Sequence, residues 1–391
     1  MKNADPMLPR RPRGRGRVSR GEWRWAALAL AGCATLWSPA RAQPPVTDFE
    51  SATGQELYQT ACAACHGADG RGQPATQLGF DLPVPDFTDC SFASREPDAD
   101  WGAIAHSGGP IRGFDEKMPA FGQALSWEQI QRILGHVRTF CPDPRWPPGE
   151  FNLPRPLVTE KAFPEDETVL TVSGTAEGET ELSHRLVYEK RFGPRNQMEV
   201  VVPYGLRDRG GGDGWTGGLG DVALGVKRVL FHDIDRGSIF SFTGEVVLPT
   251  GDEDDGFGRG TTVLEPFVTW GQILPRDSFL QMQAGFEVPT DGDRADDEAF
   301  VRAAIGRTWV RNRFGRAISP MIEFLGGREL VSGEEWLWDV LPQVQVTLNT
   351  RQHVMANLGV RLPVTDSGER DTQILFYILW DWFDGGFFEG W

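Results

Sequence analysis

The chain has 391 residues, with 39 Lys and Arg against 55 Asp and Glu, which gives a formal net charge of −16. This charge excludes a nucleic-acid partner, which needs a basic protein face to neutralise its phosphates. With 40% hydrophobic residues, 47 Gly and five Cys, the composition also excludes wholesale disorder, a disulfide scaffold and a polytopic helical membrane protein, but not a membrane β-barrel.

Residues 1–42 have the pattern of an export signal peptide. Seven arginines precede the apolar stretch Ala26–Trp37, which is too short to span a membrane, and residues 40–42 (Ala-Arg-Ala) form a small-x-small cleavage site. Residues 30–33 (Leu-Ala-Gly-Cys) offer an alternative, a lipoprotein-type site at which Cys33 would carry the lipid. Both alternatives predict that the protein leaves the cytoplasm. No later stretch reaches about 18 apolar residues, so no transmembrane helix is expected in the mature chain.

Residues 62–66 read Cys-Ala-Ala-Cys-His, which is the C-x-x-C-H signature of covalent c-type haem attachment. Two thiols three residues apart lie on one helical turn, so Cys62 and Cys65 can both add to the haem vinyl groups. His66 then reaches the iron from one face. We therefore predict one covalent haem c in a domain spanning residues 43–141. A redox-active dithiol is the alternative for such a cysteine pair.

The second axial ligand is expected on the far side of the haem. Met118 is the only methionine between the cleavage site and residue 150, and a thioether opposite a histidine raises the potential of the iron. His106 and His136 are the competing candidates. His136 falls outside the apolar stripe of the helix expected over residues 126–140, so it is expected to face solvent.

These motifs resemble the class I c-type cytochromes over roughly residues 50–141. The resemblance implies a compact all-α fold in which the first and last helices cross, with Gly54 and Tyr58 at the crossing. It also implies an electron carrier whose iron is held by His66 and Met118.

Cys90 and Cys141 lie outside the haem motif. In an oxidising compartment they are candidates for one disulfide, which would close a loop of about 50 residues and stabilise the fold by about 4 kcal/mol. Two buried free thiols are the alternative.

Residues 142–165 contain seven prolines, which exclude a continuous helix or strand. We expect a proline-rich linker, which would reach about 70 Å if it were fully extended as polyproline II. Trp146 and Phe151 could dock this linker on a neighbouring element.

Residues 166–391 alternate between apolar and polar side chains, as in Phe240, Phe242, Val246 and Leu248 against Ser241, Thr243 and Glu245. The same pattern recurs over 222–227, 280–288 and 354–362, in runs that are long for a soluble sandwich. It predicts an antiparallel transmembrane β-barrel with lipid outside and water inside. Tryptophans near the expected strand ends fit interfacial girdles.

Long and short connections alternate along this region. Six long ones carry 20 acidic and five basic residues, and five tight turns lie between them, which predicts about twelve strands. Outer-membrane barrels place their short turns in the periplasm, so the haem domain is expected on the periplasmic side.

The glycine-rich segments around 217–221, 248–252 and 264–267 resemble an outer-membrane family of MetA-pathway phenol-degradation-like transporters, over roughly residues 180–390. The resemblance implies a channel-like barrel. Together the two halves predict a monohaem cytochrome anchored in the bacterial outer membrane, which carries single electrons at the periplasmic face. Its expected partners are a periplasmic redox protein or a small redox solute, and outer-membrane lipid.

Two alternatives remain for the function. One is an extracellular electron conduit of the fused porin–cytochrome type, and the other is a solute transporter whose haem domain serves as plug or redox sensor. An enzyme is not expected, because an iron ligated by His and Met has no open position for a substrate.

Overall fold

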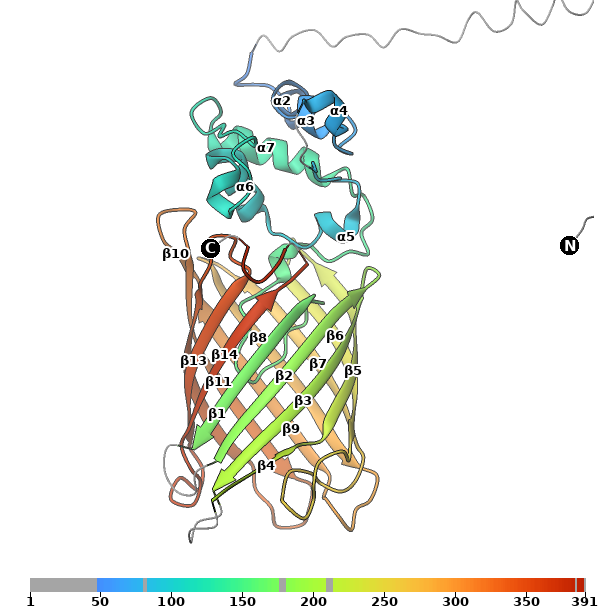
Figure 1. Ribbon diagram of the computed structural model, residues 1–391, viewed down its shortest axis with the longest axis vertical. Coiled ribbons are helices and arrows are strands. Elements are labelled where there is room, and N and C mark those ends of the chain that lie inside the picture. The colour runs from blue at the N-terminus through green and yellow to red at the C-terminus, as the bar shows by residue number, and fades with distance from the viewer. Residues whose placement is uncertain (1–47, 80–82, 176–180, 209–213, 384, 390–391) are drawn as a thin grey trace, which may run out of the picture. The chain divides into compact units, whose positions relative to one another are not determined.

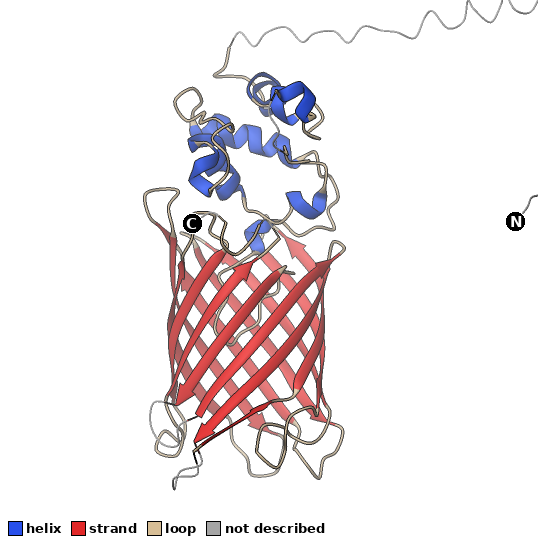
Figure 2. Ribbon diagram, viewed as in Figure 1, coloured by secondary structure: helices blue, strands red, loops and turns tan. Residues whose placement is uncertain are grey.

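The computed structural model describes residues 48–391 except 80–82, 176–180, 209–213, 384 and 390–391. The expected signal peptide and Cys33 lie outside the described residues. Residues 48–391 cluster as one compact unit, in which helices come first and strands follow (Figures 1 and 2).

The helical part contains six α-helices and a 3₁₀-helix among the described residues up to 141. Their bounds are α2 (Gly54–Ala61), α3 (Ala63–His66), α4 (Ala75–Leu78), α5 (Cys90–Ala93), α6 (Asp98–Ser107), η2 (Gly109–Arg112) and α7 (Trp127–Arg138). Capping boxes start both α2 and α7, with Thr53 paired to Glu56 and Ser126 paired to Gln129. None of the described helices has the length and apolar character needed to span a membrane.

Helices α2 and α7 cross at close range, as the resemblance implied. A Cβ atom at Gly54 would overlap the carbonyl group of Arg132, so only glycine permits this approach. The ring of Tyr58 packs 5.3 Å from the rings of both His136 and Phe140. The expectation that His136 faces solvent is therefore wrong, because its edge completes the aromatic contact at the crossing.

The strands form a closed antiparallel barrel of twelve, as predicted. The barrel strands are β1 (Glu167–Thr175), β2 (Glu181–Phe192), β3 (Asn196–Asp208), β5 (Val222–Asp233), β6 (Ser238–Leu248), β7 (Val263–Leu274), β8 (Ser278–Pro289), β9 (Glu298–Arg307), β11 (Ala317–Glu329), β12 (Leu337–Thr347), β13 (Val354–Pro363) and β14 (Gln373–Asp381). The pairings of β1 with β14 and of β9 with β11 close the sheet. Two short strands, β4 (Trp215–Leu219) and β10 (Trp309–Val310), pair with β3 and β11.

The barrel is polar inside and apolar outside, the reverse of a soluble sandwich. On β8, Gln281 and Gln283 are 1% and 3% exposed, whereas Met282 and Phe286 are 42% and 52% exposed. Most barrel strands alternate in this sense, whereas β14 turns Leu375, Tyr377 and Leu379 inward. An outward apolar face and an inward polar face fit a barrel embedded in lipid.

The two ends of the barrel differ in the length of their connections. The turn end has the connections 193–195, 234–237, 275–277, 308–316 and 348–353. The loop end has the connections 176–180, 209–221, 249–262, 290–297, 330–336 and 364–372. Both the first residue of β1 and the last residue of β14 lie at the turn end, since an even number of strands returns the chain to its starting side.

Candidate haem site

The C-x-x-C-H residues form a single helical turn. Cys62 ends α2 and precedes α3, and its carbonyl oxygen accepts hydrogen bonds from the backbone N–H of Cys65 (3.1 Å) and of His66 (2.9 Å). Both thiols are half-buried and free, although the structure pairs the other two cysteines of this domain. This arrangement suits two thioether bonds to one porphyrin.

His66 is prepared for metal binding by its surroundings. The ring of Phe87 stacks on the imidazole at a centroid distance of 5.0 Å. Burial lowers the pKa of His66 to about 4, so the imidazole is neutral at physiological pH, which is the form that ligates a metal. Its Nδ1 atom is buried and has no hydrogen-bond partner among the described residues. A half-buried, neutral imidazole with an unpartnered ring nitrogen, beside two free thiols, fits haem c.

Tyr58 holds the chain that follows the motif. Its hydroxyl group donates a hydrogen bond to the carbonyl oxygen of Gly67 at 2.8 Å. Sequence reasoning placed Tyr58 at the helix crossing but missed this second role. No local sequence pattern predicts this hydrogen bond, because it joins a side chain of α2 to the backbone that follows α3.

Met118 lies between η2 and α7, in a segment fixed by its backbone. Its carbonyl oxygen accepts a hydrogen bond from the N–H of Gly109 (2.9 Å), and its own N–H donates to the carbonyl oxygen of Asp115 (3.2 Å). The side chain is half-buried. The role of Met118 as second axial ligand stays a prediction.

The two competing histidines are both engaged in packing. His106 lies 5.1 Å from the ring of Phe314, which belongs to a turn of the barrel, and its Nδ1 atom is 2.9 Å from the hydroxyl of Ser107. His136 packs at the helix crossing described above. The choice of Met118 over these two histidines stays a prediction.

Replacing Met118 by alanine is expected to lower the reduction potential of the haem and to change its visible spectrum, since loss of a thioether ligand removes the group that favours ferrous iron. A redox titration followed by absorbance measures both effects. His106→Ala is the matched control and should keep the wild-type spectrum. An unchanged spectrum and potential in Met118→Ala would remove this residue from the iron.

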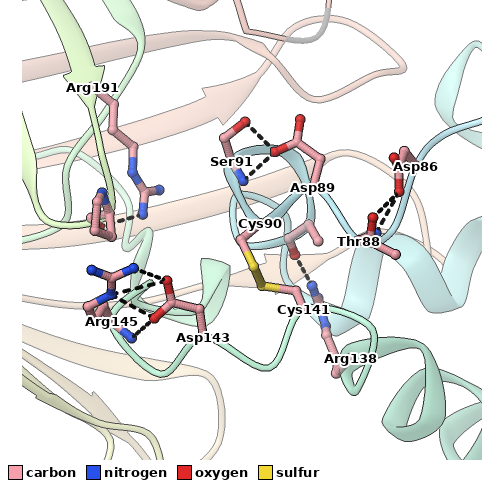
Figure 3. Close-up of a disulfide and its surroundings, with 12 residues drawn as sticks. Asp86, Thr88, Asp89, Cys90, Ser91, Arg138, Cys141, Asp143, Arg145 and Arg191 are labelled. Carbon is pink, nitrogen blue, oxygen red and sulfur yellow. Dashed lines mark hydrogen bonds and ion pairs between the residues drawn. A yellow bond between two sulfur atoms is a disulfide. The ribbon is translucent and has the colours of Figure 1, made fainter. Parts of the chain in front are cut away.

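Cys90 and Cys141 form the disulfide proposed for them. The bond joins α5 to the segment after α7, with a Cα–Cα distance of 5.2 Å (Figure 3). Beside it, Arg138 donates to the carbonyl oxygen of Ala93 and stacks 4.1 Å over the ring of Trp101. A cross-link that closes a loop of 51 residues contributes about 4 kcal/mol on the chain-entropy argument.

The helical domain contacts the turn end of the barrel. Arg112 donates to the carbonyl oxygen of Phe314 at 2.6 Å, and Arg351 donates to that of Gly113 at 3.1 Å. The ring Nε2 of His353 lies 2.8 Å from a carboxylate oxygen of Glu96.

The contact between Glu96 and His353 stabilises the charged form of the glutamate. Burial alone would raise the pKa of Glu96, but the neighbouring His353 and arginines hold it below its usual value. Arg95 adds a salt bridge to Asp166, the residue that precedes β1. Several charged contacts thus join the two halves of the chain.

The proline-rich stretch 142–165 does not extend as a free linker. Residues 149–166, which we call the luminal segment, begin with the 3₁₀-helix η3 (Gly149–Phe151) and continue inside the barrel, where Figure 2 shows them as a loop behind the strands. Phe151 and Phe163 pack with residues of β5 and β6, and Leu153 packs with residues of β8 and β11. Leu157 packs against β1, β2 and β12. The segment therefore touches opposite walls of the lumen.

Polar side chains that line the lumen form hydrogen bonds with the backbone of the luminal segment. The carboxylate of Glu323 accepts hydrogen bonds from the N–H groups of Leu157 (2.9 Å), Val158 (3.1 Å) and Thr159 (2.6 Å). Tyr377 donates from its hydroxyl group to the carbonyl oxygen of Arg155 at 2.6 Å. Sequence reasoning missed this plug, since nothing local in a proline-rich stretch reveals that distant strands will supply its hydrogen-bond partners.

Comparison with known families divides the chain in the same way. Residues 50–137 match the family described as "Cytochrome C oxidase, cbb3-type, subunit III", and residues 166–315 match "Putative MetA-pathway of phenol degradation". The chain thus joins a c-type cytochrome domain to a barrel domain of the MetA-pathway type. No curated protein matches it.

Several solved structures are similar to the barrel. An outer membrane channel from Pseudomonas putida F1 is 13% identical, with 58% of this chain and 99% of that chain covered and a TM-score of 0.44. The KdgM porin is 10% identical, with 55% and 98% covered and a TM-score of 0.37. The NanC porin is 8% identical, with 54% and 97% covered and a TM-score of 0.38.

Proposed function

We propose that this fusion of a c-type cytochrome domain with a porin-like barrel is an outer-membrane-anchored monohaem electron carrier that works at the periplasmic face. The observation that carries the proposal is the single turn holding Cys62, Cys65 and His66, with both thiols free and the imidazole neutral, in a domain bonded to the turn end of a lipid-facing barrel.

The chemistry follows from the residues that would hold the cofactor. Haem c supplies a single-electron couple between Fe(II) and Fe(III) when it is bound through Cys62 and Cys65 and ligated by His66 and Met118. The chain itself fixes the thiols on one turn, keeps the imidazole in its neutral form by burial and stacks the ring of Phe87 on it. A site with two protein ligands on the iron suits electron transfer rather than substrate chemistry.

The contacts between the domains support the periplasmic placement. Residues of the helical domain bond to Phe314, Arg351 and His353, all of which lie in turns at the turn end. Outer-membrane barrels direct their short turns to the periplasm. The electron partners would then be a periplasmic redox protein or a small redox solute.

The position of the luminal segment and that of the haem domain count against the two alternative functions, the solute transporter and the extracellular electron conduit. A solute transporter needs a path past residues 149–166, which pack against opposite walls of the lumen. An extracellular conduit needs the haem to exchange electrons across the height of the barrel, and the charged contacts hold the haem domain at one end.

A polymer-linked hydroquinone, too large to cross the outer membrane, distinguishes the carrier from the conduit. In intact cells we expect the haem to stay oxidised on adding this donor, and to be reduced once the outer membrane is permeabilised. Absorbance of the reduced haem is the readout, and cells making the Cys62→Ser/Cys65→Ser chain give the background. Equal reduction in intact and permeabilised cells would favour the extracellular conduit.

A further inference from the structure

The lumen wall carries a row of glutamates in strand register. Glu189 of β2 lies opposite Glu199 of β3, which lies opposite Gly225 of β5. Gly225 in turn lies opposite Glu245 of β6, and Glu245 lies opposite Glu265 of β7. Four of the five positions in this part of the row are therefore acidic, and each belongs to a different strand.

The row continues toward the loop end. Leu264 pairs with Val288, which puts Glu265 beside Glu287 of β8. Glu287 lies opposite Glu298 of β9, which lies opposite Glu329 of β11. Because barrel strands tilt relative to the barrel axis, a row of residues perpendicular to the strands moves along that axis from one strand to the next. The glutamate row runs from Glu189 on β2, near the turn end, to Glu329, the last residue of β11, at the loop end.

Cationic side chains of the luminal segment neutralise the end of the row that lies near the turn end, at Glu189. Arg155 lies 2.8 Å from Glu189 and also bonds to Glu167, the first residue of β1. Lys161 lies 3.2 Å from Glu167 and 2.7 Å from Glu165. This part of the row thus already binds cationic groups, which the chain supplies from within.

Further along the row, Glu245 and Glu265 lack direct salt bridges of this kind, although Arg185 and Arg302 line the same cavity and act on both carboxylates from a greater distance. Glu245 is only 8% exposed, and neither Glu245 nor Glu265 has a hydrogen-bond or ion-pair partner among the residues that the structure describes. Both line a cavity of about 360 Å³ that the luminal segment borders with Leu157, Val158 and Glu160, and Glu287 lines it as well. Of the two arginines in this cavity, Arg302 donates to Gln283 at 3.3 Å, and Arg185 lies 4.0 Å from carboxylate oxygens of Glu160 and Glu199.

Two like charges directly opposite each other on neighbouring strands destabilise a sheet. Gly225 has no side chain that could pair with Glu245. A carboxylate oxygen of Glu245 lies 3.5 Å from the position that a Cβ atom on residue 225 would take. A buried and unpaired carboxylate is costly unless a cation or a proton compensates it.

We propose that Glu245 and Glu265 form a binding site for a hard divalent cation in the part of the lumen between the luminal segment and the loop end. The facing carboxylates supply oxygen ligands, which such cations prefer, and the cavity leaves room for the water molecules that complete their coordination. The acidic connections of the loop end concentrate cations at the entrance to this site. The site does not depend on the haem.

Mn²⁺ is a suitable probe, because its paramagnetic signal in solution disappears when the ion binds. We expect the purified full-length protein in detergent to bind Mn²⁺ saturably at one site per chain, with competition by Ca²⁺. Glu245→Gln and Glu265→Gln, each tested separately, should weaken this binding by more than about tenfold. Asp254→Asn, which removes an exposed acid from a loop, is the matched control and should bind as the wild type does.

Heat-dependent migration on a gel establishes that each variant barrel is folded, and either folded glutamine variant suffices for the comparison. The absence of saturable binding by the wild type, or equal binding by the glutamine variants, would overturn the proposal. Equal loss in Asp254→Asn would also overturn it, since the ions would then be held by loop charge. The haem-free Cys62→Ser/Cys65→Ser chain should bind Mn²⁺ normally, which keeps this test separate from that of the electron carrier.

Discussion

Replacing Cys62 and Cys65 together by serine is expected to remove all covalently bound haem from the protein. A serine hydroxyl group does not add to a vinyl group as a thiol does, and both thiols lie on the one turn that presents His66. Each single variant keeps one thioether position and should retain part of the haem. Pyridine haemochrome analysis and haem staining of denaturing gels measure the outcome, with one haem per chain expected in the wild type.

The matched control uses the other two cysteines of the domain. Cys90→Ser/Cys141→Ser removes the disulfide and should lower stability by about 4 kcal/mol while leaving the haem attached. Covalent haem in the Cys62→Ser/Cys65→Ser chain, or a colourless wild type from a host that attaches haem c, would contradict the proposed electron carrier.

Replacing residues 153–163 by a glycine–serine sequence of equal length is expected to convert a closed barrel into an open pore. These residues fill the lumen with the apolar side chains of Leu153, Leu157 and Phe163, and the replacement has none to pack against the walls. Single-channel conductance in planar bilayers should rise several-fold above the wild-type value.

A single substitution tests the hydrogen bonds that hold the segment in place. Glu323→Ala leaves the N–H groups of Leu157, Val158 and Thr159 without their acceptor, at a cost of about 3 kcal/mol or more. Openings of the pore should therefore be more frequent than in the wild type. Glu298→Gln, which removes an acidic group near the loop end and away from the segment, is the control. A wild-type conductance as high as that of the glycine–serine chain would show that the segment does not close the lumen.

The plug also changes how the two halves of the chain are connected. A free linker would let the haem domain swing over a range set by its length. Here the segment runs from the haem domain into the barrel, and Arg155 and Lys161 fasten it to glutamates of the first two strands. We expect such anchoring to keep the haem near the turn end, where a partner would have to approach it.

Local sequence patterns were sufficient for the outline of the fold. The C-x-x-C-H spacing placed both thiols on one turn because helical geometry alone fixes that relation. Alternation of period two, with long and short connections in turn, gave twelve strands and their lipid-facing side, since each strand records its environment in its own residues. The pairing of Cys90 with Cys141 was likewise within reach, whereas the crossing at Gly54 came from the resemblance to class I c-type cytochromes rather than from a local pattern.

Tertiary structure alone decided the interior of the barrel. Nothing near residue 155 indicates that its guanidinium group meets Glu189, or that Glu323 accepts the backbone of a segment more than 160 residues earlier. The same holds for the glutamate row, because consecutive acidic residues of the row lie 10 to 46 positions apart in the sequence and come together only through strand register. Sequence determines which face each residue takes, whereas closure of the sheet determines which residues meet across the lumen.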